Sequence, residues 1–116
     1  MAGVNLLAYV SAAVSNGQFD MNLATNVYRM SAPMSSTSAV IPAPNPQYIP
    51  QSSQYYYFEM EVGVDPSATS ISGPAEWTWL AGGELPSFGY AGHTLYISVR
   101  FDCGIRSFLA NVWRIA

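Results

Sequence analysis

Few side chains in this 116-residue chain could carry out acid–base or nucleophilic chemistry: one histidine, one cysteine and seven carboxylates. Catalysis needs titratable groups that converge on one site. His93 follows Gly92 in a predicted link between strands, with no serine, cysteine or carboxylate motif beside it, so we interpret it as structural or solvated. Cys103 is the only cysteine, which excludes an intrachain disulfide or a thiolate metal cluster, and we interpret it as a small apolar residue at a strand end. We therefore predict no catalytic residue and no enzymatic activity.

The acidic residues and the glycine pair predict neither a metal site nor a cofactor site. Glu59, Glu61 and Asp65 suggest cation binding, but the ligand-loop pattern of Ca²⁺ sites is absent. Glu59 and Glu61 have the spacing of one strand face, which favours a solvated surface. Gly82-Gly83 has neither the lysine nor the strand-to-helix context of a phosphate loop, so we predict a turn there. The sequence therefore indicates no metal and no cofactor.

Aromatic side chains are the strongest candidates for a binding surface. Residues 55–57 are three tyrosines and residues 77–79 read Trp-Thr-Trp; flat rings of this kind serve both protein interfaces and sugar stacking. Strand alternation should place about half of these rings in the core. We expect these aromatic rings to lie in the core and in a subunit interface, and the alternative is that they form a platform that binds a glycan. The predicted interface comprises Leu6, Leu7, Tyr9, Tyr48, Tyr55, Tyr56, Tyr57, Trp77 and Trp79.

The C-terminal part of the chain carries the clearest strand signals. Apolar and polar residues alternate over 95–101, which predicts a half-buried strand. Residues 108–115 are apolar on both sides, as is typical of a strand covered on both faces. One side of this second strand would carry Leu109, Trp113 and Ile115, and the other Phe108, Ala110 and Val112. We therefore expect the C-terminus to be core.

Shorter strand signals occupy the rest of the chain. Residues 54–64 alternate cleanly, and residues 18–30 predict two short strands or one strand with a bulge. Asn16-Gly17 predicts a tight turn before them. Residues 31–37 are interpreted as a polar connection. Further short strands are predicted at 39–41, 69–72 and 76–79.

The N-terminal run and the proline-rich segment are the least regular parts. Residues 1–14 form an arm or the first strand, since the pattern fits both a helical stripe and alternation, and we favour an extended arm or strand. Residues 42–53 contain four prolines and predict a loop, because proline has no amide proton for a sheet. With seven or eight short antiparallel strands and no long helix, residues 1–116 predict one all-β domain, a β-sandwich or jelly-roll-like barrel.

Charge is scarce in this chain. Only 9% of residues are charged, lysine is absent and the net charge is −3, whereas an ordinary soluble domain has about a quarter charged residues. We interpret so little charge as a sign of obligate assembly. The four scattered arginines give no basic stripe for nucleic acid. The apolar N-terminal run is too short to cross a bilayer, so no membrane partner is expected.

The order of several segments resembles a small β module of tailed-bacteriophage structural proteins, which occurs at tail-fibre ends and in other surface components of the particle. That module has a strand ending in an Asn-Val-type step, a threonine-rich strand, a prolyl loop, a Trp-Pro-Gly-Gly-x-x-Pro segment and a closing hairpin with an Asp-Gly turn. The resemblance covers residues 17–115 and rests on segments 17–30, 39–44, 77–86 and 95–104. Two positions depart from it: Leu80 replaces the proline, and Cys103 expands the turn.

The resemblance implies a virion structural protein without catalytic activity. A capsid decoration or cement protein fits best, and a tail-fibre or baseplate component comes second. It further implies a homotrimer on the particle surface, in contact with other virion proteins such as the major capsid protein, after assembly in the host cytoplasm. The N-terminal arm and the prolyl loop are expected to reach neighbouring chains. A carbohydrate-binding module, with a host surface glycan as partner, is the alternative of another class.

Overall fold

The computed structural model describes residues 10–21, 26–49, 55–86, 90–102 and 107–116. Within these ranges the chain is all-β, with twelve strands and one 3₁₀ helix, η1 (Pro46–Tyr48). The strands are β1 (Val10–Ser11), β2 (Val14–Ser15), β3 (Gln18–Phe19), β4 (Val27–Ser31), β5 (Met34–Ser35), β6 (Ser38–Val40), β7 (Ala43–Pro44), β8 (Tyr55–Gly63), β9 (Ser70–Ser72), β10 (Trp77–Trp79), β11 (Thr94–Asp102) and β12 (Ser107–Ile115). The prediction of an all-β, sandwich-like fold is confirmed.

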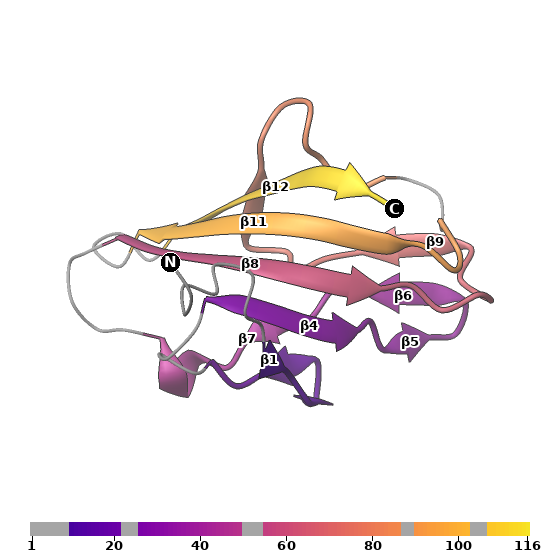
Figure 1. Ribbon diagram of the computed structural model, residues 1–116, viewed down its shortest axis with the longest axis horizontal. Coiled ribbons are helices and arrows are strands. Elements are labelled where there is room, and N and C mark those ends of the chain that lie inside the picture. The colour runs from indigo at the N-terminus through magenta and orange to yellow at the C-terminus, as the bar shows by residue number, and fades with distance from the viewer. Residues whose placement is uncertain (1–9, 22–25, 50–54, 87–89, 103–106) are drawn as a thin grey trace, which may run out of the picture.

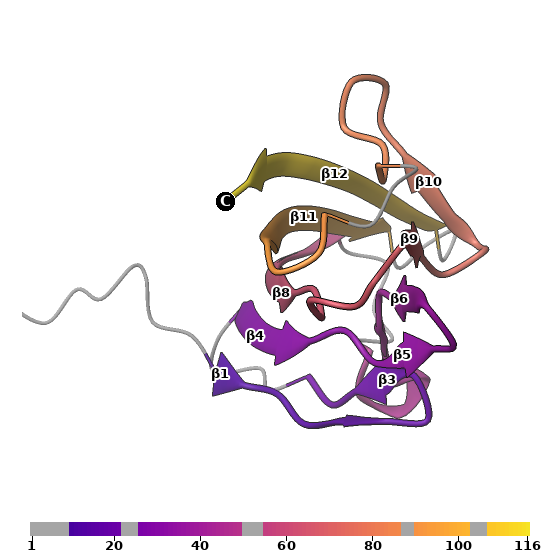
Figure 2. The same ribbon diagram turned by 90° about the vertical axis from the view of Figure 1, so that its right-hand side faces the viewer.

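The described strands form one large sheet and two small ones (Figure 1). The large sheet has the order β1-β4-β8-β11-β12-β10, and the small sheets have the orders β2-β3-β7 and β5-β6-β9. Figure 2 shows β3, β5, β6 and β9 lying across from the curved layer of β4, β8, β11 and β12. The apolar side chains of both layers meet between them.

Strand number and direction differ from the sequence prediction. Instead of seven or eight antiparallel strands, the described residues form twelve, and five of their pairings are parallel: β1–β4, β4–β8, β10–β12, β3–β7 and β6–β9. The parallel pairings arise because strands far apart in sequence meet, with short hairpins such as β5–β6 inserted between β4 and β8. Alternation reports which face a residue occupies and not which strand lies beside it.

The long central strands follow the predicted alternation. In β11, residues Leu95, Ile97, Val99 and Phe101 are all buried, at 2% exposure or less. Strand β11 pairs antiparallel with β8 along its whole length, from Thr94 opposite Gly63 to Asp102 opposite Tyr55. Two long ladders of this kind make β8, β11 and β12 the rigid centre of the large sheet.

Tight turns close two small hairpins. The predicted Asn16-Gly17 turn is confirmed: both residues have positive φ, 55° and 73°, and they link β2 to β3. A second hairpin, β5–β6, lies in the segment that was predicted to be a plain polar connection. Its turn uses Ser36 at φ 57°, a conformation that glycine or asparagine adopts more readily, so the sequence carried no strong turn signal.

The proline-rich segment is only partly the predicted loop. Strand β7 and helix η1 lie within it, and Pro42 and Pro44 are buried. The non-proline amides supply the donors: Ala43 N–H donates to the Gly17 carbonyl at 3.0 Å, and Asn45 N–H donates to the Phe19 carbonyl at 2.8 Å. Because the prolines alternate with these donors, they occupy positions where the ladder needs no amide proton.

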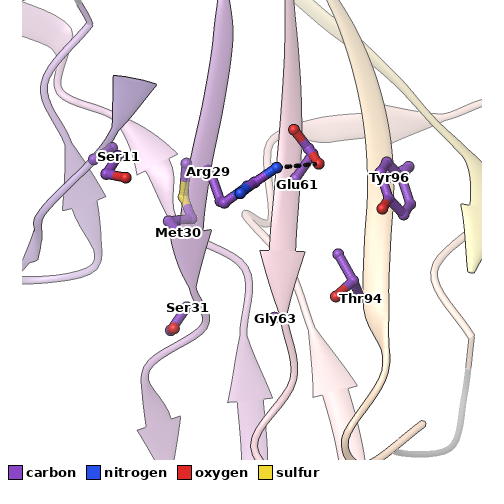
Figure 3. A pocket seen from close by; sticks show the side chains of 9 residues that line it. Ser11, Arg29, Met30, Ser31, Glu61, Gly63, Thr94 and Tyr96 are labelled. Carbon is purple, nitrogen blue, oxygen red and sulfur yellow. Dashed lines mark hydrogen bonds and ion pairs between the residues drawn. The ribbon is translucent and has the colours of Figure 1, made fainter. Parts of the chain in front are cut away.

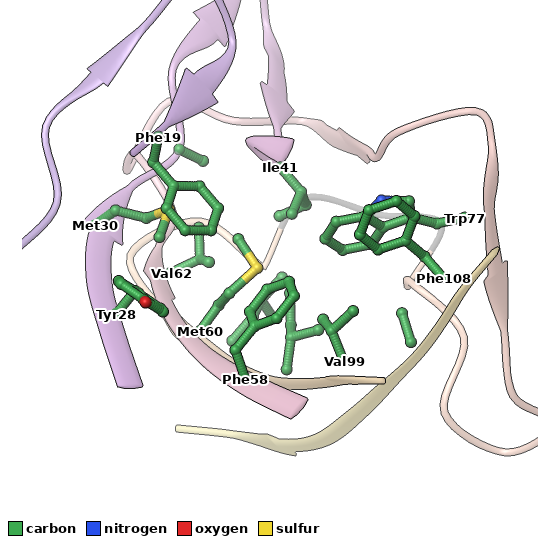
Figure 4. Packing of buried hydrophobic residues seen from close by; sticks show 14 of the residues in the cluster. Phe19, Tyr28, Met30, Ile41, Phe58, Met60, Val62, Trp77, Val99 and Phe108 are labelled. Atoms are coloured by element: carbon green, nitrogen blue, oxygen red, sulfur yellow. The ribbon is translucent and has the colours of Figure 1, made fainter. Parts of the chain in front are cut away.

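Aromatic rings fill the space between the layers (Figure 4). Phe58 lies at the centre, with ring centroids 6.2 Å from Phe19, 6.3 Å from Tyr28 and 6.5 Å from Trp77. Trp77 in turn stacks on Phe108 at 5.4 Å. These edge-on and stacked ring pairs add to the energy of apolar burial.

Strand β12 departs most from its prediction. Phe108 and Ala110 are buried, but Leu109 and Trp113 are 36% and 51% exposed, so the prediction of a strand covered on both faces is wrong. The register with β11 shifts so that Tyr96 pairs with Arg114 while Ile97 pairs with Val112. This β-bulge leaves Trp113 as the extra residue.

Beyond the bulge, the even-numbered residue Arg114 faces outward and the odd-numbered residue Ile115 faces the core, the reverse of the order before it. Ile115, predicted to share a side with Leu109 and Trp113, instead pairs with Leu95 and packs against the core. The C-terminal strand is therefore core on one side and surface on the other.

Candidate interaction surface on the outer face of the sheet

The solvent side of β8, β11 and β12, together with Leu80 just after β10, forms a continuous surface that we call the outer face. Register pairs define its rows: Tyr57, Arg100 and Leu109 form one, Glu59, Ser98 and Asn111 the next, and Glu61, Tyr96 and Arg114 the third. Since their strand neighbours point into the core, all these side chains point away from it. The outer face therefore combines rings, aliphatic groups and both signs of charge.

An apolar groove crosses the first two rows of the outer face. It has a volume of about 250 Å³ and is lined by Tyr57, Leu80, Ser98, Arg100, Leu109 and Asn111. Tyr57 and Leu80 remain 48% and 45% exposed there. Partial burial and the neighbouring Glu59 carboxylate raise the pKa of Tyr57, opposed by a side-chain hydrogen bond with Ser98. The tyrosine is thus neutral, held against the sheet and available to a partner.

The third row holds an aromatic and cationic cluster. The rings of Tyr96 and Trp113 have centroids 5.4 Å apart, and the Arg114 guanidinium carbon lies 5.1 Å from the Tyr96 ring centroid. A cation over a ring face is attracted by the ring quadrupole. The arginine therefore lies along the outer face, and its charge is placed there before any partner arrives.

A larger polar pocket adjoins this cluster on the β4 side (Figure 3). It has a volume of about 520 Å³, and Arg29, Glu61, Thr94 and Tyr96 are among its lining residues. Arg29 reaches from β4 to Glu61 on β8, where its Nη2 donates to Oε1 at 3.4 Å. The ion pair links β4 to β8, and no nucleophile with an adjacent base lines the pocket among the described residues.

The residues considered for chemistry do not converge. His93 is exposed, and its ring packs against Tyr90 with centroids 5.7 Å apart. Asp65 belongs to its own turn, where the Ser67 hydroxyl and amide donate to it at 2.6 and 2.8 Å and lower its pKa. In the parts of the chain that the structure describes, no three His, Cys, Asp or Glu side chains group as metal ligands. Cys103 lies outside those parts.

The predicted interface residues divide between surface and core. Tyr48 and Tyr57 are exposed, at 43% and 48%, whereas Tyr56 and Trp79 are half-buried against the core. Trp77 is 5% exposed, so its ring belongs to the core and is not available to a partner. Leu6, Leu7 and Tyr9 lie outside the described residues, as does the side chain of Tyr55.

The sequence prediction missed three residues of the outer face: Leu80, Leu109 and Trp113. It had assigned Leu109 and Trp113 to a covered strand and gave Leu80 no surface role. Strict alternation places one polar residue, Asn111, on the side of Leu109 and Trp113, and this is the sequence signal against a covered side. Arg114 alternates with Phe108 and Ala110 in the sequence and reaches the outer side because of the bulge at Trp113.

No helix within the described ranges is long and apolar enough to cross a membrane. No protein-family model, no curated protein and no solved structure matches the chain.

Proposed function

We propose that this chain is a non-enzymatic structural protein of a tailed-bacteriophage virion, most closely a capsid decoration protein that binds the particle surface and stabilises it. One observation carries the proposal: Tyr57, Leu80, Leu109 and Trp113 gather on the outer face with 36–51% of each residue exposed. In a chain with only 9% charged residues, such a surface suits a permanent partner. The resemblance to phage surface modules over residues 17–115 supports the same role.

The outer face suits binding by contact. It lies on β8, β11 and β12, nine residues each, whose paired backbones hold the exposed rings and aliphatic groups in fixed positions. A preorganised surface loses little conformational entropy on binding. On a symmetric shell the same contact is repeated many times, so modest individual contacts add up to strong attachment. The proposed partners are the major capsid protein and further copies of the chain.

A carbohydrate-binding module is the second candidate, and the apolar groove is the observation that favours it. Tyr57 offers a half-exposed ring there, with the hydrogen-bonding side chains of Ser98, Arg100 and Asn111 beside it. An aromatic platform flanked by planar polar groups is suited to stacking and orienting a sugar ring. This role would make the chain an attachment protein, as in a tail fibre or baseplate.

Purified particles provide the test. We expect mass spectrometry and immunogold labelling to find the chain on the particle surface, in fixed ratio to the shell protein. Recombinant chain should rebind particles stripped of it, Trp113→Ser should lose that binding, and Tyr48→Ser, an exposed tyrosine on η1, should keep it. Absence of the chain from purified particles would refute the proposal. Micromolar binding on a glycan array that Tyr57→Ala abolishes would favour the second candidate.

A further inference from the structure

We infer that the outer face packs against the same face of a second copy of the chain about a two-fold axis, with β8 of each copy over β12 of the other. The pairing rests on the proposed role of this face as a contact surface, and it takes a second copy of the chain, not the shell protein, as the partner that covers the face. The shell would then bind the assembled pair through its other surfaces. The pairing also fixes which residues meet across the interface.

The distribution of exposed apolar side chains favours identical faces. Five large apolar residues are exposed among the described residues, and four of them, Tyr57, Leu80, Leu109 and Trp113, belong to the outer face. Only Tyr48, on η1, lies elsewhere. A three-fold ring, as the resemblance implies, joins two different patches of each subunit, whereas a two-fold pair uses one patch twice. The described surface offers one patch.

The strand register determines the contacts. A two-fold axis parallel to β11, in the plane of the interface, places each row opposite the same row of the second copy. The same axis places β8 of one copy opposite β12 of the other. Tyr57 of one copy then meets Leu109 of the other, because both pair with Arg100. Glu61 meets Arg114 of the second copy, because both pair with Tyr96. Aligned packing of two sheets face to face is a common arrangement in proteins.

Charges on the outer face are complementary under this operation. The outward side of β8 carries Glu59 and Glu61, and the outward side of β12 carries Arg114. Glu61 is held by Arg29 at 3.4 Å, and Arg114 is held over the Tyr96 ring, so both charges already lie on the face. Each copy contributes Glu61 and Arg114 to this contact, so the Glu61–Arg114 pair forms twice, with Arg29 sharing each Glu61 carboxylate.

Arg100 lies close to the proposed axis, where it approaches its own equivalent. Tyr57 is its register partner on β8, and Asp102 follows two residues later on the same side of β11. A ring and a carboxylate are both favourable neighbours for a guanidinium group. The like charges at the axis therefore have local compensation.

The outer face approaches the lower limit of size for a stable pair. Strands β8, β11 and β12 have nine residues each, so their face measures roughly 30 by 14 Å at about 3.3 Å per residue and about 4.8 Å per strand. The flanking strands β4 and β10 bring the flat footprint to roughly 550 Å², and protruding side chains enlarge it. Stable interfaces bury about 800 Å² on each partner.

Sedimentation of the full chain, with charge-reversed variants, tests the pairing. We expect the wild type to have twice the chain mass of 12.6 kDa. Glu61→Arg and R114E should each weaken self-association at least tenfold, because both charge pairs of the dimer become repulsive. An equimolar mixture of the two variants should associate again, since position 61 of either chain then faces a residue of opposite charge at position 114 of the other. Glu76→Arg, a charge reversal off the face, should remain paired.

Each other outcome overturns the pairing. A wild-type monomer at 100 µM excludes it, and a mass three times that of the chain excludes the two-fold arrangement. Variants that self-associate like the wild type, or a mixture that stays monomeric while circular dichroism shows folded chains, exclude the register. Failure of the pairing is distinguishable from failure of the proposed function. A monomer that still binds stripped particles would refute the pairing alone. A dimer that is absent from purified particles would refute the virion role alone.

Discussion

Gly83 holds the turn after β10 against β12, and Gly83→Ala is expected to destabilise the fold. A Cβ at this position would overlap Oδ1 of Asn111 and would lie 2.8 Å from its Cγ and 3.3 Å from its Cα. The amide end of Asn111 can rotate away, but its Cα belongs to β12 and cannot. The turn is tied to that strand, since Val112 N–H donates to the Gly83 carbonyl at 2.8 Å.

The structure allows two responses to the added methyl group. Either Asn111 leaves its present rotamer, or the turn lifts and lengthens the hydrogen bond from Val112. Overpacking of this kind costs about 1–3 kcal/mol. With an unfolding entropy of about 2.1 cal/mol/K per residue, each kcal/mol lowers the Tm of a chain of this length by about 4 °C. Gly83→Ala should therefore lower the Tm by about 4–12 °C.

Thermal and urea denaturation followed by circular dichroism measure this change. Gly63→Ala is the matched control, because its Cβ would lie 3.9 Å from the Met30 carbonyl oxygen, an ordinary contact; its free energy of unfolding should change by less than about 0.5 kcal/mol. Asn111→Ala removes the overlapping atoms, so adding Gly83→Ala to it should cost less than half as much. Equal costs in the two backgrounds would refute the steric argument.

Three further changes probe the core, a tyrosine and a turn. Phe58→Ala should cost about 3–5 kcal/mol of unfolding free energy in urea denaturation, because the ring is fully buried, whereas exposed Tyr48 should tolerate alanine within about 0.5 kcal/mol. Burial, and then a hydrogen bond with Tyr28, raise the pKa of Tyr56. The folded state therefore keeps this proton above pH 10, so stability should fall as pH rises past 10, and it should fall less steeply in Tyr56→Phe. Absorbance at 295 nm should show a late-titrating tyrosine that Tyr56→Phe removes. Hydrogen bonds lower the pKa of Asp65. The stability that this carboxylate contributes above pH 4 should therefore be lost as pH falls below 4. In urea denaturation at a series of pH values, Asp65→Asn should make the free energy of unfolding less dependent on pH in this range.

Alternation predicted the long strands well because burial acts on each strand separately. In β8 and β11 every second residue faces the core, and residues such as Phe58 and Val99 are fully buried. Pairing was not predictable in the same way. The parallel contact of β4 with β8 joins Val27 to Glu59, and nothing local to either residue reports the other. Strand direction depends on where intervening segments place the chain, which a period of two does not encode.

The proline segment shows a second limit. Four prolines within residues 42–50 argue against a strand only if every amide must donate. In β7 the donors come from Ala43 and Asn45, on either side of Pro44, so an edge strand forms in spite of the prolines. Spacing of prolines by two leaves the ladder positions free, and this detail of spacing, and not proline content, decides the local structure.

The candidate surface was missed for a related reason. An apolar strand side has the same sequence pattern whether the chain's own second layer or another molecule covers it. In β12, Leu109 and Trp113 match the pattern of a buried side, but the structure leaves them 36% and 51% exposed. The bulge at Trp113 brings Arg114 to the side that already carries Asn111, and a core would exclude both, because burying an unpaired charge costs far more than a ring gains. Across an interface, however, such a charge can be paired by a second molecule. A strand side on which the structure places an arginine beside exposed apolar residues is therefore better interpreted as a contact surface than as core, and mixing Glu61→Arg with R114E tests that interpretation at the residue on which it depends.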